Sequence, residues 1–200
     1  TLKVSNHRLS WRRTLGTWRE REVRPSFDGE ALRLPEHIAE FPAREANAAL
    51  YFWLVASVAH APEPVKEDDP LRADLRALQA SIAMTQETLK DCPGLRGFYE
   101  TLVGACRSQR PTTQLPKFER ALEAAIDHLL GGPEPTNSLA AEFIMLIRQP
   151  EASLDTITAP HGYRPFQSIP MWPDLRPMAE RAAVDRLPES EEQGEGSGED

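Results

Sequence analysis

The sequence contains little that would support catalysis or metal binding. Its five histidines are dispersed, and none stands three or four residues from another histidine or a cysteine, which is the usual ligand spacing on a helix. The glycine motifs that bind phosphates or dinucleotides are missing. The Gly-x-Ser-x-Gly motif of hydrolases is missing too. We therefore expect a chain that is not an enzyme and that binds no cofactor.

Cysteine and long apolar runs are also scarce. The two cysteines, Cys92 and Cys106, are interpreted as reduced thiols of a cytoplasmic protein, with a disulfide as the alternative. The uncharged, mostly apolar stretch of residues 46–61 is shorter than the ~20 residues that span a bilayer. The mean hydropathy of −0.49 also argues against an integral membrane protein.

Charge is unevenly distributed along the 200 residues, and this defines three regions. Residues 1–22 are a basic lead-in that we expect to be partly helical. Residues 23–180 are expected to form a helical domain with a hairpin. Residues 187–200 contain six acidic residues and no basic one, which predicts a disordered linker. Because the chain lacks an initiator methionine and ends in such a linker, we expect it to be part of a longer protein, with a further C-terminal domain.

The basic lead-in permits a second interpretation, binding of nucleic acid. Residues 1–24 carry seven Lys or Arg, together with Trp11 and Trp18 as possible stacking groups. Glu20 and Glu22 interrupt the basic run, however, and the rest of the chain is acidic. We therefore expect no nucleic-acid partner.

The stretch 46–61 is expected to form most of a central helix that runs over about 43–61. It contains Leu50-Tyr-Phe-Trp-Leu-Val55 and Val58, so large apolar side chains fall on nearly every face at a period of 3.6 residues. A helix that is apolar all round is normally surrounded by other elements. Prolines 62 and 64 end it.

A hairpin is predicted for about 23–34, because Asp28-Gly29 lies between alternating apolar residues and suits a type I′ turn. Phe27, Leu32 and Leu34 would share its buried face. Pro25, which has no N–H to donate, indicates that the first strand is an edge strand.

Four more amphipathic segments, at about 70–90, 95–107, 116–130 and 138–149, predict helices joined by short connections. Asp69 followed by Pro70 is a good start for the first of them, and Asn137 or Ser138 caps the last. Short connections favour antiparallel neighbours. The expected fold is therefore mainly α: an antiparallel helical bundle with a small β-hairpin.

Residues 150–188 are rich in proline and are expected to be extended. Tyr163, Phe166 and Trp172 place large aromatic groups among these prolines. They either cover one end of the bundle or form a docking surface for a partner or a following domain. These three are our candidate docking residues.

One remote alternative is a metal-dependent helical enzyme. Glu119, Glu123 and Asp127 share one face of the segment 116–130, and His128 is adjacent. Carboxylates that converge in a bundle core can bind metal, but the Glu-x-x-His motif of such sites is missing. We interpret these residues as a solvated helix face.

The order of these motifs resembles one known family. The hairpin Phe27-Asp-Gly-Glu-Ala-Leu-Arg-Leu-Pro35 is followed by Ile38-Ala-Glu-Phe-Pro42 and Leu50-Tyr-Phe-Trp-Leu54, and much later by Gly162-Tyr-Arg-Pro-Phe166 and Pro170-Met-Trp-Pro173. This arrangement, over roughly residues 20–176, is similar to the nitric oxide reductase activation proteins of the NorD type. The rubisco-activating CbbO-type proteins are related to that family and form the alternative.

The resemblance implies a function that the residues alone do not. Such proteins combine a helical N-terminal part, an acidic linker and a von Willebrand factor A domain with a metal site of Asp-x-Ser-x-Ser type. They partner a hexameric MoxR-type AAA+ ATPase and activate a target enzyme, which for the NorD type is nitric oxide reductase. Because this sequence contains no Asp-x-Ser-x-Ser, we expect the divalent metal in a domain outside it and assign no metal ligand here. The expected role is that of an adaptor.

Overall fold

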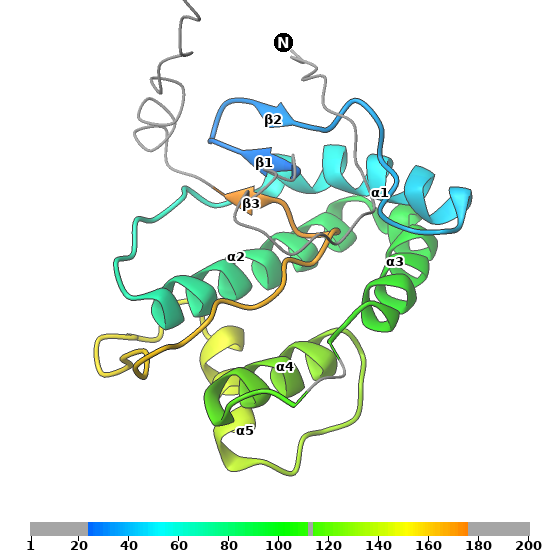
Figure 1. Ribbon diagram of the computed structural model, residues 1–200. Coiled ribbons are helices and arrows are strands. Elements are labelled where there is room, and N and C mark those ends of the chain that lie inside the picture. The colour runs from blue at the N-terminus through cyan, green and yellow to red at the C-terminus, as the bar shows by residue number, and fades with distance from the viewer. Residues whose placement is uncertain (1–23, 112–113, 176–200) are drawn as a thin grey trace, which may run out of the picture.

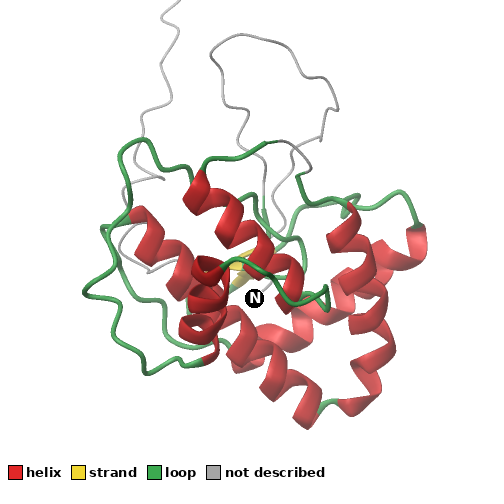
Figure 2. Cartoon of the chain, turned by 90° about the horizontal axis from the view of Figure 1, so that it is seen from below, coloured by secondary structure: helices red, strands yellow, loops and turns green. Residues whose placement is uncertain are grey.

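The computed structural model describes residues 24–111 and 114–175 (Figure 1). The predicted basic lead-in, residues 1–22, and the predicted acidic linker, residues 187–200, lie outside the described residues, as do the last residues of the predicted helical domain. In the described part, helices make up most of the body and long loops connect them (Figure 2).

The five α-helices of the described residues confirm a mainly α fold. They are α1 (Arg44–Ser57), α2 (Pro70–Asp91), α3 (Arg96–Ser108), α4 (Lys117–Leu129) and α5 (Ser138–Arg148). Short 3₁₀ turns, η1 (Val58–His60) and η2 (Pro93–Leu95), follow α1 and precede α3. Among the described helices, α1 packs mainly against α3, and α5 packs against both α2 and α4. Neighbours in sequence are therefore neighbours in space for α4 and α5, whereas α1 and α2 find their main partners further along the chain.

Two helices begin at the residues that the sequence predicts. The side chain of Asp69 accepts hydrogen bonds from the backbone N–H groups of Leu71 and Arg72, and Pro70 occupies the first helical position. The side chain of Asn137 accepts from the N–H of Leu139 at 2.9 Å. These caps satisfy N–H groups that the first turn of a helix leaves without a partner.

The hairpin is present, but its turn differs from the prediction. Strand β1 (Ser26–Phe27) pairs antiparallel with β2 (Leu32–Arg33), with Phe27 opposite Leu32, so the loop has four residues and not the two of a type I′ turn. The carboxylate of Asp28 organises this loop, because it accepts from the N–H groups of Glu30 and Ala31 and from the guanidinium of Arg33. Leu34 is buried, whereas Phe27 and Leu32 are only partly buried.

The prediction that β1 is an edge strand is wrong. A third strand, β3 (Asp174–Leu175), pairs parallel with β1, so the order is β2-β1-β3 and β1 lies in the middle. Pro25 is compatible with this position because it lies just before the strand and contributes its carbonyl oxygen, which accepts from the N–H of Asp174 at 2.9 Å. A proline is a problem in a sheet only where its missing N–H is needed.

The position of α1 also differs from the prediction, because the helix is not enclosed on all sides. Leu50, Trp53 and Leu54 are fully buried, but Phe52 on the opposite face is 54 % exposed. The indole Nε1 of Trp53 donates to the backbone oxygen of Met171 at 3.0 Å, which fixes α1 to the chain just before β3. Helix α1 is therefore a boundary element with one core face and one apolar outer face.

No helix in the described part of the chain is long and apolar enough to cross a membrane. The two cysteines are free thiols, and burial raises the pKa of Cys106 to about 11.

Candidate functional site

Residues 150–175, which we call the C-terminal segment, run beside α2 and end in β3 (Figure 1). Hydrogen bonds fix this segment at several points. The N–H of Ala159 donates to Asp69 at 2.8 Å, and the carbonyl oxygen of Gln167 accepts from the guanidinium of Arg110 at 2.7 Å. The segment has almost no regular secondary structure, so side chains of the helices supply the hydrogen bonds that a sheet or helix would otherwise provide.

The predicted docking residues Tyr163, Phe166 and Trp172 all lie on this segment and pack against the core. The hydroxyl of Tyr163 donates to the carboxylate of Asp74 at 2.6 Å. The backbone N–H of Phe166 donates to the same carboxylate oxygen at 3.1 Å. Trp172 is 8 % exposed, whereas Tyr163 and Phe166 are partly buried. Their role in docking stays a prediction.

The carboxylate of Asp74 accepts both of these hydrogen bonds, and its surroundings shift its pKa. Burial raises its pKa to about 6, and the nearby charge of Glu123 acts in the same direction. The hydrogen bonds from Tyr163 and Phe166 act against this shift, because they stabilise the ionised form. Burial and the charge of Asp74 also raise the pKa of Tyr163 far above its usual value. Tyr163 therefore remains a hydrogen-bond donor to Asp74.

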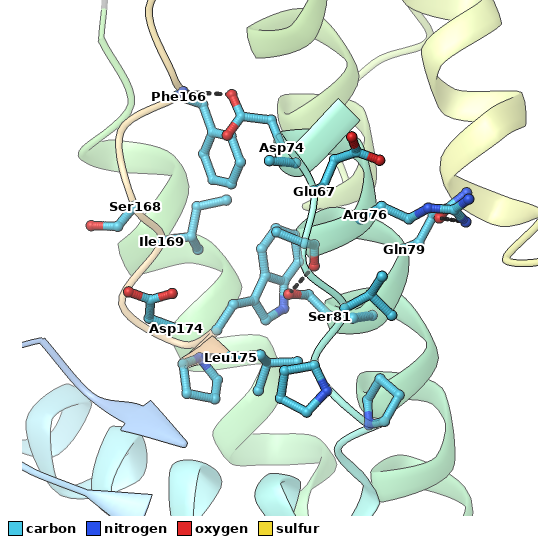
Figure 3. Close-up of a pocket in the computed structure, with 18 of the residues that line it drawn as sticks. Glu67, Asp74, Arg76, Gln79, Ser81, Phe166, Ser168, Ile169, Asp174 and Leu175 are labelled. Carbon is cyan, nitrogen blue, oxygen red and sulfur yellow. Dashed lines mark hydrogen bonds between the residues drawn. The ribbon is translucent and has the colours of Figure 1, made fainter. Parts of the chain in front are cut away.

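A cavity of about 580 Å³ lies between α2, the loop before it and the C-terminal segment (Figure 3). In Figure 3 the side chains of Phe166 and Ile169 lie on one side, and Arg76 and Gln79 lie on the other. Its volume is within the range of about 300–1,000 Å³ that is typical of ligand sites. Two of the predicted docking residues, Phe166 and Trp172, are part of its wall.

The wall of the cavity contains a polar group without a partner. The indole Nε1 of Trp172 is buried and has no hydrogen-bond acceptor among the described residues. A buried donor that is left unpaired costs about 1–3 kcal/mol, so native proteins nearly always provide an acceptor. The second buried tryptophan, Trp53, has such an acceptor in the carbonyl oxygen of Met171.

A second candidate surface lies on the outer face of α1 and the start of α3. We call it the aromatic patch; it consists of the exposed residues Tyr51, Phe52, Val55 and Phe98. The rings of Phe52 and Phe98 stack at 5.8 Å between centroids, and Tyr51 meets Phe52 edge to face at the same distance. Exposed apolar groups that gather in this way are typical of interaction sites.

Sequence reasoning missed the aromatic patch, although a signal was present. The inner residues Ala46, Ala49, Leu50, Trp53, Leu54 and Ser57 recur at helical spacing and already form a complete core-facing stripe. Two alanines in that stripe let α1 approach the core closely. The large apolar residues outside this stripe, such as Phe52, are not needed for the core, so they indicate a second apolar face on α1.

The four residues of the remote metal alternative do not converge. Glu123 pairs with Arg110, Asp127 pairs with Arg107, and Glu119 accepts from the N–H of Arg164. Within residues 24–111 and 114–175, no three His, Cys, Asp or Glu side chains are grouped as metal ligands.

The interpretation of these residues as a solvated face is wrong for Glu119 and Glu123, whereas the side chain of Asp127 is 36 % exposed. Glu119 is 8 % exposed and the side chain of Glu123 is 13 % exposed. Arg164 and Gln167 of the C-terminal segment lie against this face through hydrogen bonds to Glu119 and Arg110. The sequence did not show that the extended segment covers α4.

Comparison with known proteins extends the resemblance seen in the motifs. The chain is 34 % identical over 184 residues to Protein NorD of Brucella suis biovar 1 and 33 % identical over the same length to Protein NorD of Brucella abortus strain 2308. Each match covers 90 % of this chain and 27 % of the relative. Protein NorD of Stutzerimonas stutzeri is 37 % identical over 107 residues, which are 53 % of this chain and 16 % of that protein.

No family model and no solved structure matches the chain. The chain spans about a quarter of the length of these Brucella relatives. The similarity nevertheless includes the hairpin, all the described helices and the C-terminal segment, because it extends over nine-tenths of the sequence. The chain is thus homologous to one region of the proteins named NorD, which confirms the resemblance seen in its motifs.

Proposed function

We propose that this chain is a non-catalytic interaction region of a NorD-type activator. In this proposal it acts as an adaptor in the cytoplasm, where a MoxR-type AAA+ ATPase and the activator together activate or mature nitric oxide reductase. The observation that carries the proposal is the similarity to proteins named NorD over 90 % of the chain. That similarity also favours nitric oxide reductase over rubisco as the target.

The aromatic patch supports the role of an interaction region. Phe52 is 54 % exposed and Phe98 is 40 % exposed, although both are large apolar residues. Aromatic groups are enriched at the centres of protein interfaces, where they bury much area at a low entropic cost. We therefore assign the aromatic patch as the main docking surface of the adaptor.

Tyr163, Phe166 and Trp172 lie outside the aromatic patch and have a different role in this proposal. Because Asp74 and the core already engage them, we expect Phe166 and Trp172 to shape the wall of the cavity and Tyr163 to hold the segment against α2. None of the three is expected to contact the ATPase directly. The divalent metal of the activator is assigned to a different domain of the whole protein.

The proposal is tested with the whole activator protein and a purified MoxR-type ATPase. We expect the two to bind and the rate of ATP hydrolysis to change. Phe52→Ser combined with Phe98→Ser should weaken binding tenfold or more, because the rings are removed from the docking surface. The matched control is Val65→Ser combined with Met145→Ser, since both residues are exposed and apolar but lie outside the aromatic patch.

Two results would count against the proposal. If the wild-type protein neither binds the ATPase nor alters its hydrolysis rate, the adaptor role is lost. If the control pair weakens binding as much as the patch pair, the assignment of the surface is lost. The target is tested separately, by measuring nitric oxide reductase activity in cells with and without the activator; rubisco activation instead would favour the alternative.

A further inference from the structure

One stretch of the C-terminal segment, residues 155–168, is fixed in the core at both ends but not in between; we call it the strap. Leu154, just before the strap, and Ile169, just after it, are buried members of the hydrophobic core. No residue of the strap itself is buried, although Tyr163 and Phe166 are partly buried against the core. The strap is therefore anchored by the residues that flank it more than by its own side chains.

Charged side chains of the helical body provide the hydrogen bonds that hold the strap in place. In the described part of the chain, every hydrogen bond between the strap and the helices or the loops next to them uses such a side chain: Ala159 N–H to Asp69, Tyr163 O–H and Phe166 N–H to Asp74, Arg164 N–H to Glu119, and Arg110 to the carbonyl oxygen of Gln167. There, no backbone–backbone hydrogen bond joins the strap to another element. The strap is thus held by a few point contacts and not by a sheet or helix ladder.

The strap bridges two helices that have little contact with each other. Helices α2 and α4 both pack against α5, and neither packs extensively against the other. Successive contacts of the strap alternate between them, because Tyr163 bonds to α2, Arg164 bonds to α4 and Phe166 bonds to α2 again. A strap residue that leaves one helix therefore pulls its neighbour away from the other helix. These hydrogen bonds are expected to break together.

The strap has the properties of a segment that opens locally. Holding its backbone in one conformation costs entropy at every residue, and the strap has no fully buried side chain to offset this cost. Segments with few buried apolar contacts open at a lower free energy than the fold as a whole. Pro165, Phe166 and Ser168 belong both to the strap and to the wall of the cavity beside α2 (Figure 3), so an open strap removes this part of the wall.

We infer that the strap opens as one unit while Leu154 and Ile169 stay in the core, and that this motion opens the cavity beside α2. The charged side chains on α2 and α4 act as the latch that keeps the strap closed. Because the motion belongs to the free chain, it is tested without a partner, and the result does not depend on the proposed function.

Hydrogen exchange of single amides, followed by NMR on the whole chain, measures the opening. After correction for intrinsic rates, the N–H groups of Ala159, Arg164 and Phe166 should exchange within about threefold of one another and at least about a hundredfold faster than Leu122 in the buried face of α4. The N–H of Trp172 lies just beyond the strap and has a hydrogen bond of its own. It should exchange as slowly as Leu122, because the flanking residues stay in place.

Tyr163→Phe tests whether the strap moves as a unit. The variant removes one side-chain hydrogen bond and no backbone bond. Exchange at Ala159 and Arg164, whose N–H groups bond to other acids, should nevertheless become faster by the same factor as at Phe166, about tenfold or more. A merely local role of the hydroxyl would change Phe166 alone, and that result would overturn the inference.

Ile147→Val is the matched control for opening without global unfolding. Ile147 is buried on α5 and has no hydrogen bond to the strap, so the variant should speed exchange at Leu122 severalfold and leave the strap amides unchanged. If the strap amides instead become faster together with Leu122, or are as slow as Leu122 in the wild type, the strap opens only when the whole chain unfolds. Either result would overturn the inference.

Discussion

Tyr163 and Asp74 form a hydrogen bond of 2.6 Å that joins the C-terminal segment to α2. The two residues are 89 positions apart in sequence. The N–H of Phe166 donates to the same carboxylate, so one buried acid holds two points of an otherwise irregular segment. Because Asp74 and Phe166 both line the cavity, this contact helps to position the cavity wall.

Tyr163→Phe is expected to destabilise the fold by about 1.5–3 kcal/mol, the usual cost of losing a hydrogen bond to a charged group. The ring still fills its place in the packing, but Asp74 keeps only the N–H of Phe166 as a donor. Urea denaturation monitored by circular dichroism measures the change. Tyr51→Phe is the matched control, because Tyr51 is 43 % exposed and should show no comparable loss. Equal stability of the Tyr163 variant and the wild type would contradict the prediction.

The raised pKa of Asp74 predicts how stability depends on pH. The folded state binds the proton of Asp74 with a pKa of about 6, against an ordinary pKa of 3.8 for an aspartate. Between these values the folded state holds more protons than the unfolded state, so stability decreases as pH rises. The contribution of Asp74 to stability is fully present below about pH 4 and is lost by about pH 7. Its size is about 3 kcal/mol, because the pKa is raised by about two units.

Asp74→Asn should remove this pH dependence, because the amide oxygen still accepts from Tyr163 and Phe166 but does not ionise. The free energy of unfolding, measured at intervals from pH 4 to pH 7, should then be flatter for the variant than for the wild type. The pKa values of Asp28 and Asp69 are lowered, because hydrogen bonds outweigh the effect of burial. The stability linked to these two acids is therefore lost as the pH falls, mainly below pH 4, which is opposite in sign to the effect of Asp74. An unchanged slope in the variant would show that another group titrates here.

Local chemistry explains which parts of the fold could be predicted from the sequence. The starts of α2 and α5 are set by Asp69 and Asn137, whose side chains bond to N–H groups two or three residues away. The core-facing stripe of α2 follows from Leu71, Leu75 and Leu78, all of which are fully buried. These features depend on neighbouring residues only, so the sequence displays them directly.

The errors concern contacts between distant segments. Helical periodicity shows which residues of α1 share a face, but it does not show whether another element covers the opposite face. Strand β3 has only two residues, too few for an alternating pattern, so its pairing with β1 had no signal. The contact between Asp74 and Tyr163 had none either, because the two residues are 89 positions apart and an aspartate alone is typical of an exposed position.

Arg110, in the loop after α3, and Glu123 of α4 form an ion pair that is expected to be important for stability. The two side chains are 10 % and 13 % exposed, and Arg110 also donates to the carbonyl oxygen of Gln167. Arg110→Met should cost about 3 kcal/mol, because it leaves the Glu123 carboxylate buried without its partner. The control is Lys90→Met, which breaks the exposed pair with Glu87 and should cause no measurable change. Thermal unfolding of the two variants provides the comparison, and similar midpoints would contradict the prediction.

Two glycines are expected to respond to alanine in opposite ways. At Gly132 an added Cβ would lie 2.6 Å from the backbone oxygen of Asp127 and still closer to its carboxylate, so Gly132→Ala should destabilise the end of α4 by about 1–3 kcal/mol. At Gly104, inside α3, an added Cβ meets nothing within 4 Å. Gly104→Ala should therefore stabilise the protein by up to about 1 kcal/mol through a better helix propensity. Chemical denaturation of both variants checks the signs, and a loss of stability at Gly104 would contradict the prediction.

The two faces of α1 should differ sharply in their sensitivity to truncation. Leu50 is fully buried, so Leu50→Ala leaves a cavity and should cost about 2–5 kcal/mol. Phe52 is 54 % exposed and its main aromatic contacts are Tyr51 and Phe98, so Phe52→Ala should cost about 1 kcal/mol or less although it removes a larger side chain. Denaturant unfolding of the two variants measures both values. A cost for Phe52→Ala as large as that for Leu50→Ala would mean that the outer face of α1 is covered, and the aromatic patch would then be part of the core and not a docking surface.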